Sequence, residues 1–235
     1  MFSLRFLANA ADLGGTMKAK FVSLAALVVS LLLVITSVQA AMQDDVDRAL
    51  SIFERFVAIP ETAIPPAVMR DAKGVAIFAM TKAGFILSGR GGAGVVLART
   101  ATGWSGPSAI GTGGIGVGFQ AGVEVSEHVI ILNTPEAVKA FSQGSNFTLG
   151  ANLTVAAGPV GRSAEVAVAP NAAVYTYSRS QGIFAGVSLE GTVLATRYEA
   201  NEEYYAKPVY AADILEGKIA PPAGAQKLLD ALSKY

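Results

Sequence analysis

The chain has 235 residues and no cysteine, which excludes disulfides, thiolate nucleophiles and cysteine-ligated metal sites. Its 18 basic and 18 acidic residues cancel, so no net positive field is present to hold nucleic acid. A chain of this length that is 52% hydrophobic can bury a sizeable core without covalent cross-links.

The N-terminus has the layout of a secretory signal peptide. Two lysines just after Met17 precede an apolar stretch, residues 21–35, that is short for a full membrane span. A signal-peptidase pattern then ends at Ala40. We therefore expect cleavage after Ala40, which makes residues 1–40 a signal peptide and the protein exported, periplasmic or secreted. Translation from Met17 and an uncleaved membrane anchor are the alternatives.

The next segment, residues 41–62, is expected to hold an N-terminal amphipathic helix. Apolar residues recur at helical spacing over residues 44–58, acidic residues occupy the first turn, and Pro60 ends the pattern. One domain is then expected over residues 63–235. It opens with a second short helix that starts at the Pro65–Pro66 pair, because proline is favoured at a helix start.

After Gly74 the sequence becomes a series of apolar runs interrupted by glycine, a pattern typical of strands. The expected strands are residues 75–80, 85–88, 95–99, 110–125, 129–132, 146–156, 165–169, 174–178, 183–189 and 192–197. Between residues 110 and 125 glycine alternates with larger residues, which places the glycines on one face and predicts close backbone approach or a curved sheet.

The remaining helices follow from capping signals. Thr134 and Pro135 predict a helix to about Gln143, and Asn201 is expected to cap a short acidic helix. The last helices are expected over residues 211–216 and 226–232. The fold class is thus mainly β with peripheral α-helices (α+β), with a glycine-rich curved sheet or barrel-like β core. Similar spacing in residues 84–99 and 182–197 suggests an internal repeat with pseudo-twofold symmetry.

Motifs for catalysis are weak. Two G-x-G-x-x-G matches, in residues 89–94 and 111–116, are followed by strand-like sequence rather than the helix that a nucleotide site needs. His128 is the only histidine and the chain has no cysteine, so the sequence lacks the usual set of ligands for a zinc site. Glu124 and Glu127 would face opposite sides of one strand, so they do not converge for acid–base chemistry. We expect no enzyme, no cofactor and no metal.

A set of motifs in fixed order resembles the SYLF family over residues 65–232. The residues that carry this resemblance include Arg99, Trp104, Ser105, Pro107, Gly158, Pro159, Gly161, Arg162, Tyr177, Gly182, Gly186, Glu190, Gly191, Asn201 and Tyr205. SYLF domains are known as phosphoinositide- and membrane-binding modules aided by an amphipathic N-terminal helix, and fungal members are linked to actin. The resemblance implies a β-rich fold and binding to the surface of a phospholipid membrane.

The expected lipid-binding residues combine the amphipathic helix with basic residues at the start of the domain. They are Arg48, Phe53, Arg55, Phe56, Arg70, Lys73, Lys82 and Arg90. The alternative is a structural or protein-interaction protein of the envelope, actin-binding-like and without a lipid ligand, whose protein partner stays open. The motif residues also have a structural interpretation, in which Arg99, Arg162 and Arg197 are internal ion-pair partners of Glu190 or Glu124.

Overall fold

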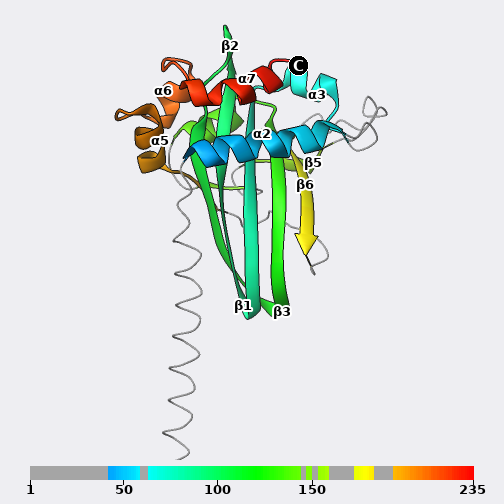
Figure 1. The fold of residues 1–235 in the computed structure, drawn as a ribbon. Coiled ribbons are helices and arrows are strands. Elements are labelled where there is room, and N and C mark those ends of the chain that lie inside the picture. Colours follow the sequence, from blue (N-terminus) through cyan, green and yellow to red (C-terminus); the bar gives the residue numbers. More distant parts are fainter. Residues whose placement is uncertain (1–41, 59–62, 144–146, 150–152, 159–171, 183–192) are drawn as a thin grey trace, which may run out of the picture. The chain divides into compact units, whose positions relative to one another are not determined.

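The computed structural model describes residues 42–58, 63–143, 147–149, 153–158, 172–182 and 193–235 (Figure 1). Residues 40–235 form a compact unit of their own. The expected signal peptide, the strands at 165–169 and 183–189, and much of the second copy of the expected repeat lie outside the described residues. In the described part of the chain, no helix is long and apolar enough to cross a membrane.

Two long strands form the centre of the fold. β1 (Gly74–Thr100) and β3 (Ser108–Leu132) pair antiparallel along their length, with a register shift between Phe85 and Leu87. We call this pair the ribbon. The prediction of separate short strands is wrong here, because the glycines bend the ribbon while its backbone pairing continues. Figure 1 shows both strands running beyond the helices to a free end.

The ribbon folds back on itself. Its outgoing half comprises residues 74–84 and 122–132, and its return half comprises residues 88–100 and 108–117. A Cβ atom at Gly94, in the return half, would overlap the carbonyl oxygen of Ile77 in the outgoing half. Where the ribbon starts and ends, the Arg99 amide donates to the Lys73 carbonyl oxygen at 2.8 Å. Glycine is required at this crossing because no other residue allows two backbones to approach so closely.

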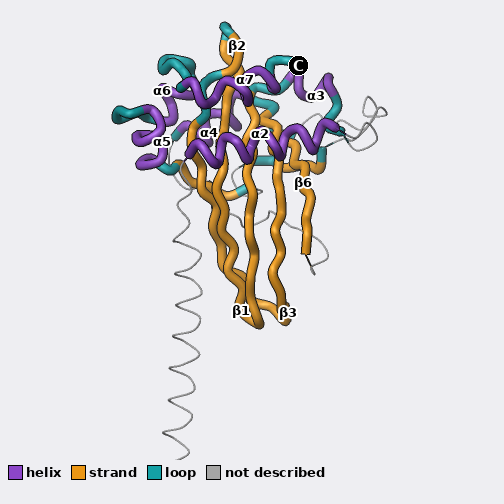
Figure 2. Tube along the Cα trace, in the orientation of Figure 1, coloured by secondary structure: helices purple, strands orange, loops and turns teal. Residues whose placement is uncertain are grey.

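Five further strands extend the two halves. β6 (Val174–Gly182) pairs with the outgoing half of β3, and β5 (Val155–Ala157) runs parallel beside β6. β7 (Val193–Thr196) pairs with the return half of β3, and β4 (Phe147–Thr148) pairs with β7. β2 (Gly103–Trp104) pairs with the end of β1. This network of strands with helices around it confirms the mainly β fold class (Figure 2).

Side chains on the two faces of the ribbon enter different cores. The even-numbered Phe78 and Ile130 of the outgoing half and Val96 of the return half share one core. Phe141 of α4 (Pro135–Ser142) closes that core. We call this even-numbered face the inner face, since the even-numbered Gly92 and Gly94 face the backbone of the outgoing half.

The odd-numbered, outer face packs against helices. Ile77 and Leu97 share a core with Phe53 of α2 (Met42–Ala58) and Leu228 of α7 (Gln226–Leu232). Figure 1 shows α2 lying across the upper part of β1 and β3, so the lower part of the ribbon extends past it. The helices therefore cover only the upper part of the outer face.

Most of the helices agree with their capping signals. Thr134 accepts the Ala137 amide at the start of α4, and α3 (Pro66–Asp71) starts at the predicted proline. α6 (Ala211–Leu215) is followed by Gly217 with φ 76°, and the short η2 (Ala223–Ala225) precedes α7. These helices form as predicted because their ends are set by local sequence.

One predicted cap is wrong. α5 (Tyr198–Tyr205) begins before Asn201, which lies inside the helix and is buried. Its side chain accepts the Ala109 amide at 2.7 Å and donates to the Ser108 hydroxyl at 3.1 Å. Asn201 therefore joins α5 to the start of β3, a long-range role that a local capping rule cannot predict.

Candidate functional site

The predicted aromatic anchors of α2 lie inside the protein. Phe53 and Phe56 are buried in the core shared with the outer face of the ribbon, and Val57 is partly buried beside them. In this conformation α2 has no free apolar face to place in a membrane. The structure thus argues against lipid contact by Phe53 and Phe56, because such contact would require α2 to leave the sheet.

The two predicted arginines of α2 are engaged in ion pairs. Arg55 forms two hydrogen bonds with Glu127 of β3, at 2.5 and 3.1 Å. Arg48 contacts the buried Asp45 at 3.1 Å. Both arginine side chains stay 43% exposed, so each can still meet an anion from solvent.

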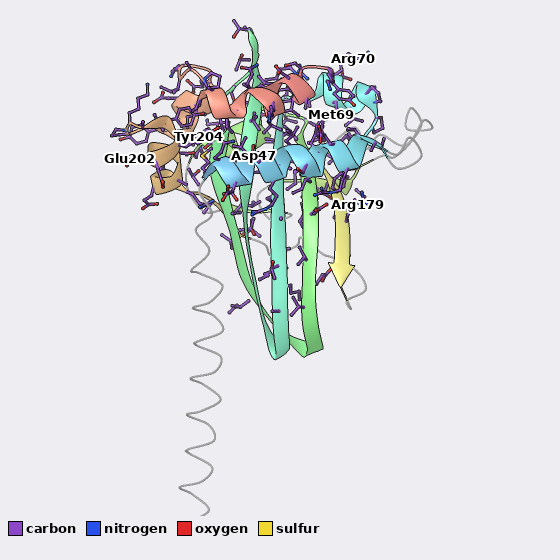
Figure 3. All side chains as sticks on the ribbon, in the orientation of Figure 1. Asp47, Met69, Arg70, Arg179, Glu202 and Tyr204 are labelled. Carbon is purple, nitrogen blue, oxygen red and sulfur yellow. The ribbon has the colours of Figure 1, made fainter. Side chains whose placement is uncertain are left out.

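The other predicted cations do not form one patch with each other. Arg70 and Lys73 are exposed at the helix-covered end of β1, where Figure 3 shows Arg70. Lys82 and Arg90 lie toward the free end, and the extended run from Lys73 to Lys82 measures about 30 Å. Two of the predicted basic residues therefore lie far from the other two.

The free end of the ribbon exposes large apolar side chains. Ile115 is 78% exposed, Val123 58% and Val125 43%. All three are odd-numbered residues of β3 and lie on the outer face, beyond the reach of α2. We call these three residues the free apolar face. Val123 and Val125 are successive positions on one face of the outgoing half, and Ile115 lies on the return half. Neighbouring exposed apolar residues mark interaction sites more often than scattered ones do.

The inner face carries buried polar side chains, of which Glu124 and Ser126 lie level with Val123 and Val125, whereas Thr112 and His128 lie nearer the helix-covered end. Thr112, Glu124, Ser126 and His128 are each less than a tenth exposed. The His128 ring stacks on Phe78 with 4.9 Å between ring centroids, and its Nε2 lies 2.8 Å from the Ser126 hydroxyl. Burial lowers the pKa of His128 to about 4, so the imidazole is neutral at physiological pH.

Several polar atoms of this inner row have no hydrogen-bond partner among the described residues. They are Nδ1 of His128, Oε1 of Glu124 and Oγ1 of Thr112. Glu124 and His128 are four residues apart on one strand, about 13 Å, so the carboxylate cannot orient the imidazole as in a catalytic triad. The row places polar groups together without bringing a nucleophile, a base and an orienting acid into contact.

Among the described side chains near the ribbon end, Glu124 and Ser126 are polar and buried inside, whereas Val123 and Val125 are apolar and exposed outside. Proteins in water normally show the reverse, with apolar residues inside and polar residues on the surface. The alternation of Glu124 with Val123 and Val125 is what produces this arrangement, since successive residues of a strand face opposite sides. Such a surface gains free energy when its outer face meets an apolar phase.

Positive charge lies at the boundary between the helices and the free apolar face. Arg179 of β6 is the register partner of Glu127 and donates to the Arg55 carbonyl oxygen at 3.5 Å. Glu127 thus has an arginine on either side, Arg55 from α2 and Arg179 from the sheet. Figure 3 shows Arg179 below α2, on the side toward the free end. We call Arg55, Glu127 and Arg179 the arginine rim; it carries a net positive charge.

The family-motif residues that the structure describes serve the fold. The Arg99 guanidinium lies 4.4 Å from the centroid of the Trp104 ring and donates to the carbonyl oxygens of Met69 and Ala72 at the end of α3. Burial lowers the pKa of Arg99, which nonetheless stays charged. The Ser105 hydroxyl accepts the Ala98 amide at 3.0 Å. These contacts hold the end of β1 against α3 and β2.

Other motif residues join the C-terminal helices to the sheet. The Tyr205 hydroxyl donates to the Pro107 carbonyl oxygen at 2.9 Å, and Gly158 leaves room for the Tyr177 ring, which a Cβ atom would overlap. Gly182 ends β6 as the register partner of Glu124. Pro159, Gly161, Arg162, Gly186, Glu190 and Gly191 lie outside the described residues.

Arg197 has a partner that the sequence did not predict. Its guanidinium pairs at 2.5 Å with the buried Asp45 of α2, not with Glu124. Glu190 lies outside the described residues. Arg197 is thus an internal ion-pair partner as the structural interpretation expects, with Asp45 as its partner among the described residues, and pairing with Glu190 stays a prediction.

The free apolar face was missed at the sequence level, although a signal for it exists. From Ile115 to Val125 every odd-numbered residue is apolar and the even-numbered ones are glycine or polar. Close packing of the glycines is one explanation of this alternation. The same pattern also predicts an apolar face, and only the extent of α2 decides whether that face is covered.

Comparison with known proteins identifies similar chains. A family model described as Ysc84, Las17-binding protein actin regulator, matches residues 113–235. SH3 domain-containing YSC84-like protein 1 is 48% identical over 202 residues in both Bos taurus and Homo sapiens, covering 83% of this chain and 59% of the relative. LAS seventeen-binding protein 3 of Saccharomyces cerevisiae is 44% identical over 202 residues, covering 82% of this chain and 44% of the relative. The chain thus spans about three fifths, or less, of the length of these relatives.

Proposed function

The chain belongs to the Ysc84 family, the SYLF-domain family that its motifs indicate, and on this premise we propose that it is a peripheral module that binds the phospholipid surface of a membrane. The free end of the ribbon is the part that contacts the membrane. Catalysis forms no part of this function.

One observation carries the proposal: near the ribbon end, the described side chains are apolar outside and polar inside. Ile115, Val123 and Val125 are exposed to solvent, whereas Glu124 between two of them is buried. Moving exposed aliphatic side chains out of water is favourable by on the order of 1 kcal/mol each. Contact with the hydrocarbon edge of a bilayer provides that gain without any change in the fold.

The arginine rim supports the same orientation. When the free apolar face enters the membrane, Arg55 and Arg179 come to the level of the phosphate groups, because they lie where helix cover ends. A basic residue near an anionic membrane surface contributes about 1 kcal/mol. The apolar contact therefore sets the depth of binding, and the rim adds a preference for anionic lipid.

A vesicle co-sedimentation experiment on residues 40–235, which form a compact unit, tests this function. We expect binding to vesicles of phosphatidylcholine and phosphatidylglycerol at low salt. Val123→Asp should reduce binding at least tenfold. Val155→Asp is the matched control, since Val155 is 39% exposed on β5, outside the ribbon end. Failure of the wild type to bind, or equal loss in both variants, would reject the proposal.

Export remains part of the proposal as well. The lysines after Met17 and the cleavage pattern at Ala40 favour a membrane surface outside the cytosol. Mass spectrometry of the protein recovered from its native compartment tests this by measuring the mass of the mature chain. We expect a chain that begins at Ala41. The protein-binding alternative, suggested by the description of the family, predicts instead that the wild type does not bind these vesicles.

A further inference from the structure

A shallow hollow lies on the outer face of the return half. Gly111 and Gly113 of β3 form its floor, and Ile115, Val193 and Ala195 form its sides. Its volume is about 500 Å³, and it is widely open to solvent. None of the described residues that line it carries a charge.

Gly113 is the residue in this hollow that the fold does not explain. A glycine weakens a strand, so its presence usually has a local cause. Gly94 allows close backbone approach, and Gly103 has φ 128°. Gly113 has no positive φ, and no described atom lies within 4 Å of the position that its Cβ would take. Among the described residues, glycine at this position therefore leaves the space above the strand unfilled.

The backbone of the floor is already fully paired within the sheet. Gly113 is the register partner of Gly91 on one side and of Val193 on the other, and Gly111 is likewise flanked by β1 and β7. A peptide laid on this floor would find no free strand edge for the hydrogen bonds of an added strand. An alkyl chain needs no such bonds, so it is the occupant that this surface suits.

The two ends of the hollow differ in the side chains that bound them. At Gly111 the side chain of Arg197 closes the floor, since its Cγ and Cδ lie 3.4 Å from the position of an added Cβ. At the other end Ile115 belongs to the free apolar face. The aliphatic carbons of Arg197 bound the end beside the helices, while its guanidinium pairs with Asp45, and Ile115 bounds the end toward the tip of the ribbon.

We propose that this hollow holds one acyl chain of a membrane phospholipid, with the chain lying along Gly111 and Gly113. This inference rests on the proposed membrane function and adds a defined lipid site to it. The head group lies toward Arg197 and the chain runs toward the free end, which is the orientation that a lipid of the contacted leaflet would have.

The test uses residues 40–235 and a lysophosphatidylcholine with a nitroxide on its acyl chain, below its micelle concentration. We expect paramagnetic broadening to be strongest at the amides of Gly111, Gly113 and Ala195. Gly113→Leu fills the hollow and should weaken lysolipid binding at least tenfold without lowering the melting temperature. Ala157→Leu, which adds the same side chain at an exposed position of β5, should bind as the wild type does.

The outcomes separate this inference from the proposed function. Unchanged lysolipid binding in Gly113→Leu, or broadening centred on Val123 instead, overturns the acyl-chain site alone. A wild-type dimer that Gly113→Leu dissociates in sedimentation equilibrium also overturns it, because the hollow is then a contact between copies. Loss of vesicle binding in Val123→Asp with lysolipid binding intact supports both. Failure of the wild type to bind vesicles overturns the proposed function itself.

Discussion

Asp45 of α2 and Arg197 after β7 form an ion pair at 2.5 Å across 152 positions of the sequence. The Asp45 side chain is fully buried, and Arg48 adds a second contact at 3.1 Å. Burial raises the pKa of Asp45, while the hydrogen bond and charge of Arg197 act in the opposite direction. The carboxylate thus loses much of its hydration and depends on its two arginines for compensation, which fixes α2 on the return half of the ribbon.

Truncation of this buried carboxylate should be costly. We expect Asp45→Ala to lower the free energy of unfolding by about 3 kcal/mol, because it leaves Arg197 partly buried without its partner. Urea unfolding measures the change. Asp44→Ala is the matched control, since Asp44 is the exposed neighbour and should change stability by less than about 0.5 kcal/mol. Equal effects of the two substitutions would contradict this role of the pair.

Two glycines of the ribbon should respond to alanine in opposite directions. Gly94→Ala forces a Cβ into the carbonyl oxygen of Ile77, so we expect a loss of more than about 4 kcal/mol or failure to fold. Gly113→Ala meets open space and should stabilise the strand by about 0.5 kcal/mol, because glycine has the greater freedom in the unfolded chain. Melting temperatures compare the pair. Similar melting temperatures for both variants would show that the two halves of the ribbon do not meet at Gly94.

Local signals predicted much of this fold. Helix starts at Pro66 and Pro135 follow from proline and threonine chemistry that acts within one turn. The opposite faces of Glu124 and Glu127 also follow from strand geometry alone: Glu124 is buried inside, and Glu127 meets Arg55 outside. Such features are predictable because neighbours in sequence decide them.

The features that were not predicted depend on distant residues. Glycine in β1 suggested strand ends, but the pairing partner in β3 keeps the strand continuous through them. Nothing near Asn201 indicates that it binds Ala109, nor does anything near Arg197 indicate Asp45. The free apolar face likewise depends on how far α2 reaches along the ribbon. These relationships are set by the way the ribbon folds, which a reading of single segments does not include.

The buried His128 makes stability depend on pH. Its folded pKa, about 4, is below the value of 6.5 for a free histidine, because burial disfavours the charged ring. Between these values the unfolded chain binds more protons than the folded one, so stability falls as pH drops from 6.5 to 4. The shift corresponds to about 3 kcal/mol. Urea unfolding across this pH range measures the slope.

The contribution of His128 can be isolated with a variant that does not titrate. His128→Gln can still hydrogen-bond the Ser126 hydroxyl, although it loses the stacking on Phe78 and is expected to be less stable. Its stability should nonetheless vary less between pH 6.5 and 4 than that of the wild type. An unchanged slope in this variant would show that other groups account for the acid sensitivity.

The proposed membrane orientation gives arginines at different places in the molecule different effects on membrane binding. Arg179 belongs to the arginine rim, whereas Arg70 of α3 is exposed at the helix-covered end (Figure 3). We expect Arg179→Gln to weaken binding to phosphatidylglycerol vesicles about fivefold, in line with about 1 kcal/mol per basic residue near an anionic surface. Arg70→Gln removes the same charge and should leave binding unchanged. The difference should shrink at high salt, because screening weakens the contribution of Arg179. A larger effect from Arg70 would mean that the opposite end of the molecule faces the membrane.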